Sequence, residues 1–223
     1  MMKLSQQELV DRIHESGVVA VLVIDEVADA VPLAQALLSG GITAMELTLR
    51  TPAALHALRA IRRDAPKMTA GIGTILTTKQ VQQVSELDAA FGVAPGTNVR
   101  VIKAARKLGL PFAPGVSTPT DIEQALECGC RLLKFFPAEE SGGLKYLKSI
   151  AAPYAHLQIR FIPLGGLNAG HINDYLNEPS VIALGGSWIA PRELIRRRDW
   201  DTIGHNSLIA SQQVKRLREK SKA

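Results

Sequence analysis

The chain has 223 residues, of which 46% are hydrophobic and 21% charged, so its composition is that of a globular protein. This length fits a single domain over residues 1–223 with a substantial core. The net charge is +5, with basic residues concentrated late in the chain at 196–198 and 215–222. Aromatic residues do not interleave with those charges, so we expect a solvated terminal helix and no nucleic-acid partner.

Short apolar runs alternate with amphipathic stretches along the chain, which is the pattern of repeated βα units. A first helix is expected over about residues 5–16. The expected strands are 18–24, 44–49, 69–75, 89–94, 111–116, 132–136, 159–164 and 181–184, with helices between them and at the end. This pattern predicts an α/β fold, a (β/α)8 TIM barrel with an extra N-terminal helix.

An open, doubly wound sheet is the alternative architecture. Its dinucleotide-binding form needs a G-x-G-x-x-G turn after the first strand. Residues 25–29 follow the first strand here and contain no glycine, which argues against that fold.

No apolar run reaches the roughly 20 residues that a membrane span needs. The amino-terminal stretch has no apolar segment of the signal-peptide type. We therefore expect a cytoplasmic protein with no membrane partner.

One lysine stands inside an apolar strand. Lys134 lies in the run Leu-Leu-Lys-Phe-Phe-Pro, with apolar residues on both sides. If its side chain points into a barrel, the low dielectric disfavours the ammonium and leaves the neutral, nucleophilic amine that imine formation requires. The alternative is a lysine on the outer face that extends past the helix layer into water.

The second strand carries polar side chains on one face. Alternation along the strand places Glu46, Thr48 and Arg50 together, which offers a base and a guanidinium that can bind a carboxylate. A structural ion pair is the alternative. Thr74 ends the glycine-rich third strand, where a ligand can approach the backbone, or else caps the next helix.

Glycines follow the last two strands. Gly165 and Gly166 come after the seventh, and Gly185, Gly186 and Ser187 come after the eighth. These are the positions at which barrels often bind phosphate through backbone N–H groups. Tight turns that bind nothing are the alternative.

Other kinds of chemistry find little support. The five histidines are scattered, and Cys128 and Cys130 are separated by one residue with no second pair, so we expect no metal site. No G-x-S-x-G motif is present, so we do not expect a serine nucleophile.

The motifs together resemble a known family. They are ELTLRT (46–51), GIGT (71–74), APG (94–96), PGV (114–116), KFFPA (134–138), PLGG (163–166) and GGSW (185–188). In this order they closely resemble the bacterial 2-keto-3-deoxy-6-phosphogluconate (KDPG) aldolases, which often also act on 4-hydroxy-2-oxoglutarate (KHG). The resemblance runs from Val18 to about Pro191.

The resemblance implies a role for each matching residue. Lys134 forms the Schiff base and Glu46 is the general acid and base. The remaining residues bind substrate: Arg50 and Thr74 hold the carboxylate, Pro95 and Phe136 line the pocket, and Gly165, Gly166, Gly186 and Ser187 bind phosphate. It also implies cleavage of a 2-keto-3-deoxy acid to pyruvate and an aldehyde, a homotrimer, and no metal or organic cofactor.

Two positions depart from the family pattern. Leu164 stands where the family commonly has threonine, which puts the choice of aldehyde in question, and Val23 stands where many relatives have arginine. The competing functions are another phosphate-binding barrel enzyme, such as an isomerase or decarboxylase, and a non-catalytic barrel that binds a sugar phosphate.

Overall fold

The structure is a computed structural model that describes residues 5–220. The end of the basic tail, residues 221–223, and residues 1–4 lie outside this range. The strands are β1 (Val18–Leu22), β2 (Ala44–Thr48), β3 (Thr69–Gly73), β4 (Gly92–Val93), β5 (Phe112–Ala113), β6 (Gly115–Val116), β7 (Leu132–Phe135), β8 (Arg160–Pro163) and β9 (Leu184–Gly186). All pair in parallel, as strands joined by crossover helices do.

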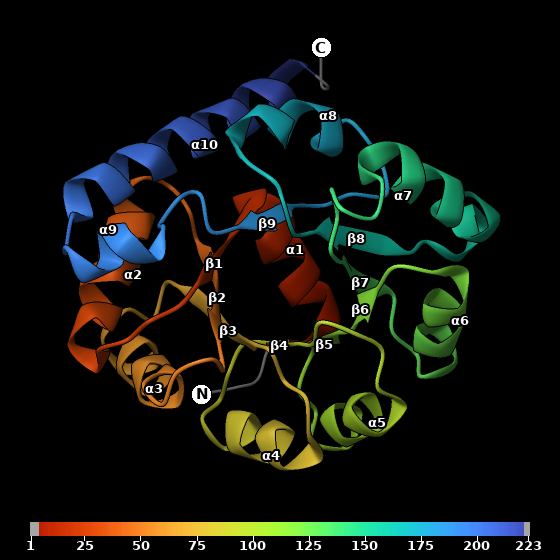
Figure 1. Ribbon diagram of the computed structural model, residues 1–223, viewed down its shortest axis with the longest axis horizontal. Coiled ribbons are helices and arrows are strands. Elements are labelled where there is room, and N and C mark those ends of the chain that lie inside the picture. Colours follow the sequence, from red (N-terminus) through yellow and green to blue (C-terminus); the bar gives the residue numbers. More distant parts are fainter. Residues whose placement is uncertain (1–4, 221–223) are drawn as a thin grey trace.

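The α-helices lie outside the strands, apart from the first (Figure 1). They are α1 (Gln6–Ser16), α2 (Ala30–Ser39), α3 (Ala54–Asp64), α4 (Thr78–Glu86), α5 (Val99–Lys107), α6 (Pro119–Glu127), α7 (Gly143–Ala151), α8 (Ile172–Leu176), α9 (Arg192–Arg196) and α10 (Trp200–Lys220). Short 3-10 segments η1 (Val27–Asp29), η2 (Ala152–Leu157) and η3 (Ala169–His171) complete the connections.

The strands form two parallel sheets that curl around a common centre (Figure 1). One has the order β5-β4-β3-β2-β1-β9 and the other β6-β7-β8. The chain passes from one sheet to the other at Pro114, whose carbonyl accepts a hydrogen bond from the Lys134 N–H at 2.9 Å. On the other side, the isolated parallel bridges Phe161–Val181 and Leu164–Gly185 join the β8 region to the β9 region.

Three expected strands differ clearly from the observed ones, and one of them, expected over 89–94, is reduced to β4 at 92–93. The expected strand 111–116 is divided into β5 and β6, because the residue between them is Pro114, which has no N–H to donate to a neighbouring strand. The expected strand 181–184 is wrong in its position, since β9 begins at Leu184 and Val181 makes only a single bridge.

Two apolar clusters follow from the alternation of side chains along the strands. Met45 and Leu47 of β2 point outward into the large cluster between the strands and the outer helices. Ala44 points inward, into a smaller cluster that includes Leu9 and Ile13 of α1. The same inward face carries Glu46 into the interior, where it is only 2% exposed.

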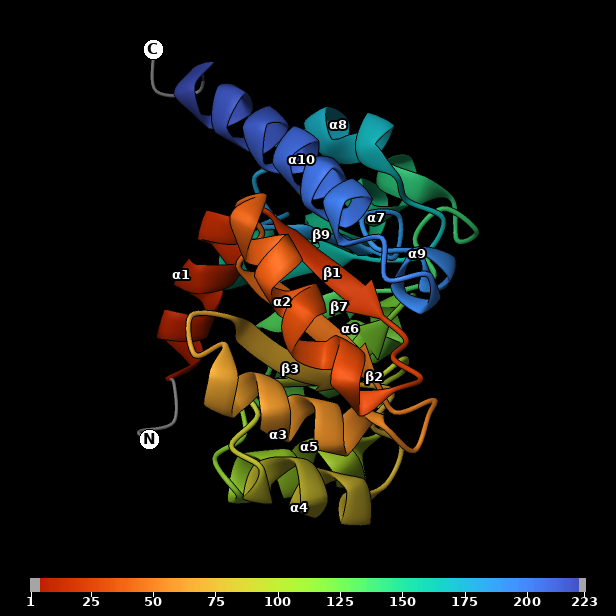
Figure 2. The same cartoon turned by 90° about the vertical axis from the view of Figure 1, so that its left-hand side faces the viewer.

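Helix α1 closes the amino-terminal end of the strands. Figure 2 shows it on the side away from the strand tips, and Figure 1 shows it behind the centre of the strands. A capping box between Ser5 and Glu8 starts this helix. The Arg218 guanidinium donates to the backbone carbonyls of His14 and Glu15 at its other end, which ties α10 to α1.

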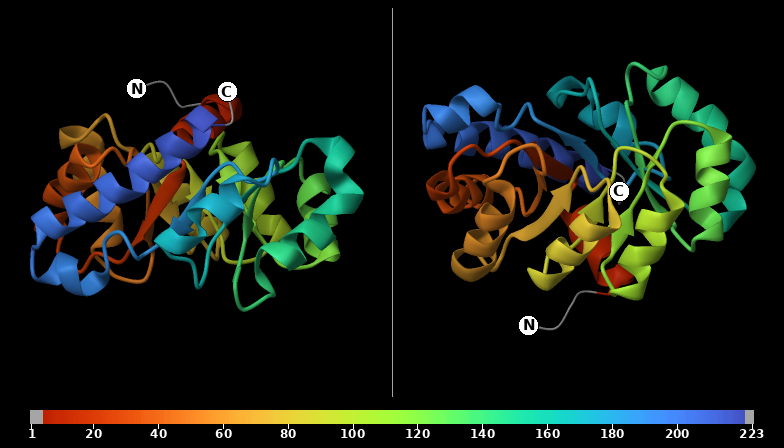
Figure 3. Two further views of the ribbon diagram at one scale, coloured as in Figure 1. Left: turned by 90° about the horizontal axis from the view of Figure 1, so that it is seen from above. Right: turned by 60° about the horizontal axis from the view of Figure 1, so that its bottom comes forward.

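Helix α10 packs along the outside, against α2 and α8 (Figure 3). The approach to α2 is close at Gly40, where an added Cβ would lie 2.3 Å from the Ser207 Cβ. The Ser211 hydroxyl donates to the Gly40 carbonyl at 2.6 Å. Among residues 5–220, neither α10 nor any other helix has the length and apolarity that a membrane span requires.

Candidate active site

A cavity of about 330 Å³ opens at the carboxyl-terminal ends of the strands. This is the end at which parallel α/β barrels hold their active sites. Its walls are Val21, Glu46, Thr48, Arg50, Thr74, Pro95, Lys134, Phe136, Leu164, Gly165, Gly166, Leu167, Gly185, Gly186 and Ser187. The structure therefore brings all ten residues that the sequence singled out into one cavity.

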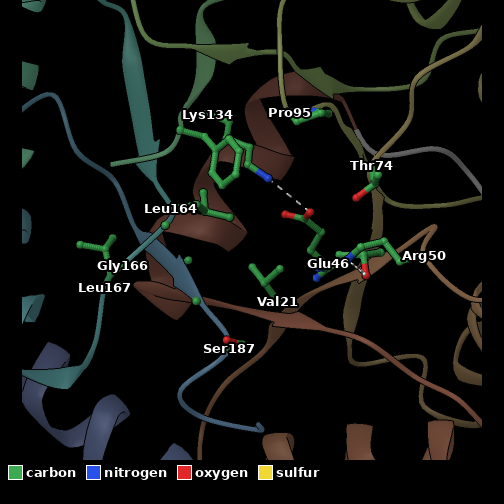
Figure 4. A pocket seen from close by; sticks show the side chains of 15 residues that line it. Val21, Glu46, Arg50, Thr74, Pro95, Lys134, Leu164, Gly166, Leu167 and Ser187 are labelled. Carbon is green, nitrogen blue, oxygen red and sulfur yellow. Dashed lines mark hydrogen bonds and ion pairs between the residues drawn. The ribbon is translucent and has the colours of Figure 1, made fainter. Parts of the chain in front are cut away.

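The deepest polar groups of the cavity are an amine and a carboxylate. Lys134 is only 7% exposed and Glu46 only 2%. The Nζ atom of Lys134 lies 3.5 Å from Oε1 of Glu46, and Figure 4 shows the two side chains pointing toward each other from opposite walls. Nζ also lies 4.9 Å from the centre of the Phe136 ring, so an aromatic face covers the amine on one side.

The Glu46 carboxylate has spare hydrogen-bonding capacity. In the described part of the chain its Oε1 atom is buried and has no hydrogen-bond partner, and its separation from Nζ is that of a loose ion pair. A buried oxygen without a donor carries a desolvation penalty. A bound substrate hydroxyl or a water molecule can satisfy that oxygen, so the carboxylate is placed to accept a hydrogen bond from a ligand beside the amine.

Glycine at position 73 makes the position of Glu46 possible. A Cβ atom on Gly73 would lie 1.7 Å from Oε1 of Glu46, so any side chain there would occupy the space of the carboxylate. The pairing of β2 with β3 places Thr48 beside Gly73, and this puts the small residue next to the Glu46 side chain.

The Arg50 guanidinium is oriented by its own strand. Its Nε–H donates to Thr48 Oγ1 at 3.1 Å, and the Thr48 hydroxyl donates in turn to the Leu22 carbonyl at 3.0 Å. Arg50 itself is exposed at the edge of the cavity, where the terminal nitrogens of its planar fork can face a ligand carboxylate.

Thr74 has an unusual backbone at this site. Its φ angle is 62°, which is an outlier for a β-branched residue. Such strain is concentrated at sites where the surroundings hold a residue for function. The threonine side chain faces the cavity on the same side as Arg50 (Figure 4).

The opposite wall is made mainly of backbone. The segments after β8 and β9 contribute Gly165, Gly166, Gly185 and Gly186, together with Ser187. Gly165 and Gly166 have φ angles of 102° and 72°, which only glycine adopts readily. A wall without side chains allows a ligand to reach backbone N–H groups.

Apolar residues that the sequence analysis did not assign to the site complete the cavity. Val21 lies at the end of β1 and Leu167 follows the glycine pair after β8 (Figure 4). Neither carries a sequence signal, because an apolar residue in an apolar segment looks like any core residue. Leu164, the departure from the family pattern, also lines the cavity and is 5% exposed.

A second, much smaller void lies beneath the pair. Leu9 and Ile13 of α1 line it from below, and Lys134, Glu46 and Leu164 separate it from the main cavity. Its volume is about 10 Å³, which leaves room for at most about one water molecule. The amine and the carboxylate are therefore accessible to ligands from the carboxyl-terminal side.

The cavity combines a buried amine beside a carboxylate with an arginine that can bind an acid, and this combination is typical of one class of enzyme. These are the groups that a class I aldolase uses to form an imine with a keto acid and to move protons around it. The parallel α/β fold, with this cavity at the carboxyl-terminal edge of its strands, is compatible with that class.

Comparison with known proteins gives the family. The profile for KDPG and KHG aldolases matches residues 9–206. A 2-dehydro-3-deoxy-phosphogluconate aldolase of Haemophilus influenzae is 40% identical over 203 residues, which cover 91% of this chain and 95% of the relative. The chain belongs to the KDPG and KHG aldolase family, whose members are lyases.

Solved structures agree with this assignment. A KDPG aldolase from Legionella pneumophila, with pyruvate captured at low pH as a covalent carbinolamine intermediate, matches with a TM-score of 0.86 and 37% identity over 91% of this chain and 97% of that one. The KDPG aldolase of Zymomonas mobilis ZM4 with 3-phosphoglycerate matches with a TM-score of 0.87 and 36% identity over 93% and 96%. The curled parallel sheet is thus the fold of KDPG aldolases.

Proposed function

We propose that the protein is a class I aldolase that cleaves KDPG to pyruvate and glyceraldehyde 3-phosphate through an imine on Lys134. The observation that carries this proposal is the buried contact between Lys134 Nζ and Glu46 Oε1 at 3.5 Å on the floor of the cavity. The likeness to a relative with pyruvate captured as a carbinolamine supports the same chemistry.

The reaction begins with attack of the neutral Lys134 amine on the C2 ketone. The new N–C bond gives a carbinolamine, and loss of water gives a protonated imine that accepts electrons from the C3–C4 bond. Glu46 takes the proton of the C4 hydroxyl as that bond breaks, and the aldehyde leaves. The remaining enamine is protonated at C3, and hydrolysis of the imine releases pyruvate and the free amine. Proton transfer of this kind contributes about 10² to 10⁴ in rate.

The two walls divide the substrate between them. Arg50 binds the carboxylate beside C2 through a bidentate contact, with Thr74 as a second donor. Backbone N–H groups of Gly165, Gly166 and Gly186, together with Ser187, bind the phosphate at the far end of the substrate. Pro95 and Phe136 pack against the carbon chain. No metal or organic cofactor takes part in these steps.

A second substrate is 4-hydroxy-2-oxoglutarate, which gives pyruvate and glyoxylate. The family profile covers both activities, and the apolar Leu164 supports a loose preference at the aldehyde end. Its side chain supplies packing but no hydrogen bond, so this position does not select an aldehyde by its polar groups.

We further propose that the two sheets form one closed (β/α)8 barrel within a single domain, with α1 as the extra N-terminal helix. Chain continuity at Pro114 and the bridges at Phe161–Val181 and Leu164–Gly185 support closure. We also infer a homotrimer from the family resemblance and a cytoplasmic location from the pattern of apolar runs in the sequence. Sedimentation velocity tests the oligomer, with a monomer mass as the result that rejects it.

Borohydride trapping tests the central proposal. The protein is incubated with pyruvate, reduced with borohydride and analysed by intact mass and peptide mapping. We expect a reduced pyruvyl adduct on Lys134 that is absent from a Lys134→Ala variant. Absence of any adduct, together with no cleavage of KDPG or KHG, rejects the aldolase proposal. An adduct on another lysine preserves the chemistry but rejects this site.

A further inference from the structure

A cluster of polar side chains lies behind the glycine pair that follows β8. The Tyr175 hydroxyl, from α8, donates to Glu139 Oε1 at 2.5 Å. His171 Nε2 lies 3.6 Å from Glu139 Oε2, and His171 Nδ1 accepts the Asn168 backbone N–H at 3.0 Å. One carboxylate thus connects α8 and η3 to the segment that leaves the cavity.

The backbone of the same region adds further contacts. The Glu139 N–H donates to the Gly165 carbonyl at 3.2 Å, and the Ala138 N–H donates to the Leu164 carbonyl at 2.7 Å. Gly166 lies directly against Glu139, because an added Cβ would be 2.7 Å from the Glu139 Cβ. Residues 164–168, which we call the glycine loop, are therefore held on their outer side by residue 139.

The inner side of the glycine loop is a wall of the active-site cavity. Gly165, Gly166 and Leu167 line the cavity, whereas Glu139, His171 and Tyr175 do not. The glycines have no side chains with which to fix their own position. Their φ angles of 102° and 72° are therefore maintained by what packs behind them.

Burial of the Tyr175 side chain favours its hydrogen bond to Glu139. Tyr175 is only 1% exposed, and a buried hydroxyl without a partner is costly. Burial and the Glu139 carboxylate raise the pKa of Tyr175, so the hydroxyl remains a donor throughout the physiological range. The carboxylate is therefore held in one position relative to the core.

We propose that Glu139 is a positioning residue for the phosphorylated aldehyde, acting through the glycine loop and held in place by Tyr175 and His171. This inference rests on the proposed function. It assigns the preference for a phosphorylated electrophile to a cluster outside the cavity that touches neither the substrate nor the reacting atoms. The imine chemistry at Lys134 is independent of it.

The test compares two aldehydes in the condensation direction. Glyceraldehyde 3-phosphate carries a phosphate and glyoxylate does not, and both are joined to pyruvate. In the Tyr175→Phe and Glu139→Ala variants, we expect the KM for glyceraldehyde 3-phosphate to rise about tenfold, which corresponds to about 1.4 kcal/mol. The KM for glyoxylate and the amount of pyruvate adduct trapped on Lys134 stay unchanged.

Tyr154→Phe is the matched control. Its hydroxyl donates to Glu123 Oε1 at 2.8 Å, so the substitution removes the same kind of bond from a place remote from the cavity. We expect unchanged KM values for both aldehydes. Tyr175→Phe is the milder of the two test variants and keeps the test informative if Glu139→Ala does not fold.

Several results overturn the proposal. They are an equal rise in KM for both aldehydes, an unchanged KM for glyceraldehyde 3-phosphate in the folded variants, and a wild-type protein that does not condense glyceraldehyde 3-phosphate at all. An equal rise in both KM values, or an unchanged KM for glyceraldehyde 3-phosphate, rejects only the role of Glu139. A wild type that forms the pyruvate adduct but does not condense glyceraldehyde 3-phosphate also rejects KDPG as the substrate. Loss of the adduct in the wild type rejects the proposed function and this inference together.

Discussion

The two walls of the active-site cavity are built in opposite ways. The wall from β2 and β3 presents side chains, among them a carboxylate, a guanidinium and two hydroxyls, whereas the wall after β8 and β9 presents mostly glycine backbone. Side chains on strands are fixed by the sheet that carries them. A glycine wall takes its shape from residues behind it. The first wall can therefore bind charged groups and transfer protons, whereas the second determines which ligand shapes fit.

The largest effect is expected where the nucleophile is lost but its charge is kept. Lys134→Arg retains a cation opposite Glu46, but a guanidinium stays protonated and cannot form an imine. We expect no borohydride-trapped adduct and a fall in kcat of more than about 10⁴, because covalent and acid–base catalysis are lost together.

A second lysine offers a control for that change. Lys148 lies 3.6 Å from a glutamate oxygen, almost the same distance as the catalytic pair, but its side chain is 56% exposed. We expect Lys148→Arg to keep full activity. An active Lys134→Arg enzyme contradicts imine chemistry at this site.

The second-largest effect is expected from a substitution that displaces the Glu46 carboxylate without replacing a charged residue. Gly73→Ala places a Cβ where the Glu46 carboxylate now lies, so the carboxylate must move away from the amine. We expect kcat to fall about 10²- to 10³-fold, similar to the fall for Glu46→Gln. Steady-state kinetics measure this, with circular dichroism to check folding.

Gly96→Ala is the corresponding control, since an added Cβ at that position meets no atom within 4 Å. Near-normal kcat is expected for this variant. Retention of wild-type kcat in Gly73→Ala argues that the position of Glu46 is not important for the reaction.

A smaller effect is expected at the carboxylate-binding end. Arg50→Lys keeps the charge but loses the planar fork and the contact from Nε to the Thr48 hydroxyl. We expect the KM for pyruvate in condensation to rise about 10- to 100-fold, the value of a hydrogen bond to a charged group. Arg59→Lys on the exposed face of α3 is the control, and equal KM values for the two variants refute the assignment.

The smallest effect is expected in the glycine wall. Gly166→Ala strains a residue at φ 72° and brings the new Cβ against Glu139. We expect about a fivefold higher KM for glyceraldehyde 3-phosphate, since strain of roughly 1 kcal/mol shifts the loop. Gly109→Ala, at φ 62° with open space around it, has similar strain elsewhere and leaves this KM unchanged. A larger rise in the KM for pyruvate than in the KM for glyceraldehyde 3-phosphate contradicts the assignment of the glycine wall to the aldehyde.

Much of the fold follows from patterns that are local in the sequence. Apolar runs with turn residues between them predicted the order of strands and helices, because each unit repeats the same local design. The end of a strand is harder to predict, since it depends on its neighbours. At Pro114 a missing N–H divides the expected strand, and β9 begins at Leu184 because pairing with β1 starts there.

The predicted site residues share a cavity for a related reason. Charged or glycine residues at strand ends depart from the local pattern, and parallel strands bring their ends together. The cluster around Glu139 had no such signal, because Glu139 lies beyond Pro137 and its partners Tyr175 and His171 are more than 30 positions away in the chain. A carboxylate just after the strand that carries Lys134 is the one local feature that points to it.

The position of helix α1 affects the order in which substrates bind and products leave. Its Leu9 and Ile13 side chains close the space below Lys134, so within residues 5–220 the lysine is reached from the carboxyl-terminal ends of the strands. A pyruvyl group bonded to Lys134 lies at the bottom of the cavity. An aldehyde that binds after it lies between this group and the opening of the cavity. In cleavage the aldehyde must therefore depart first and pyruvate last, and in synthesis pyruvate must enter first.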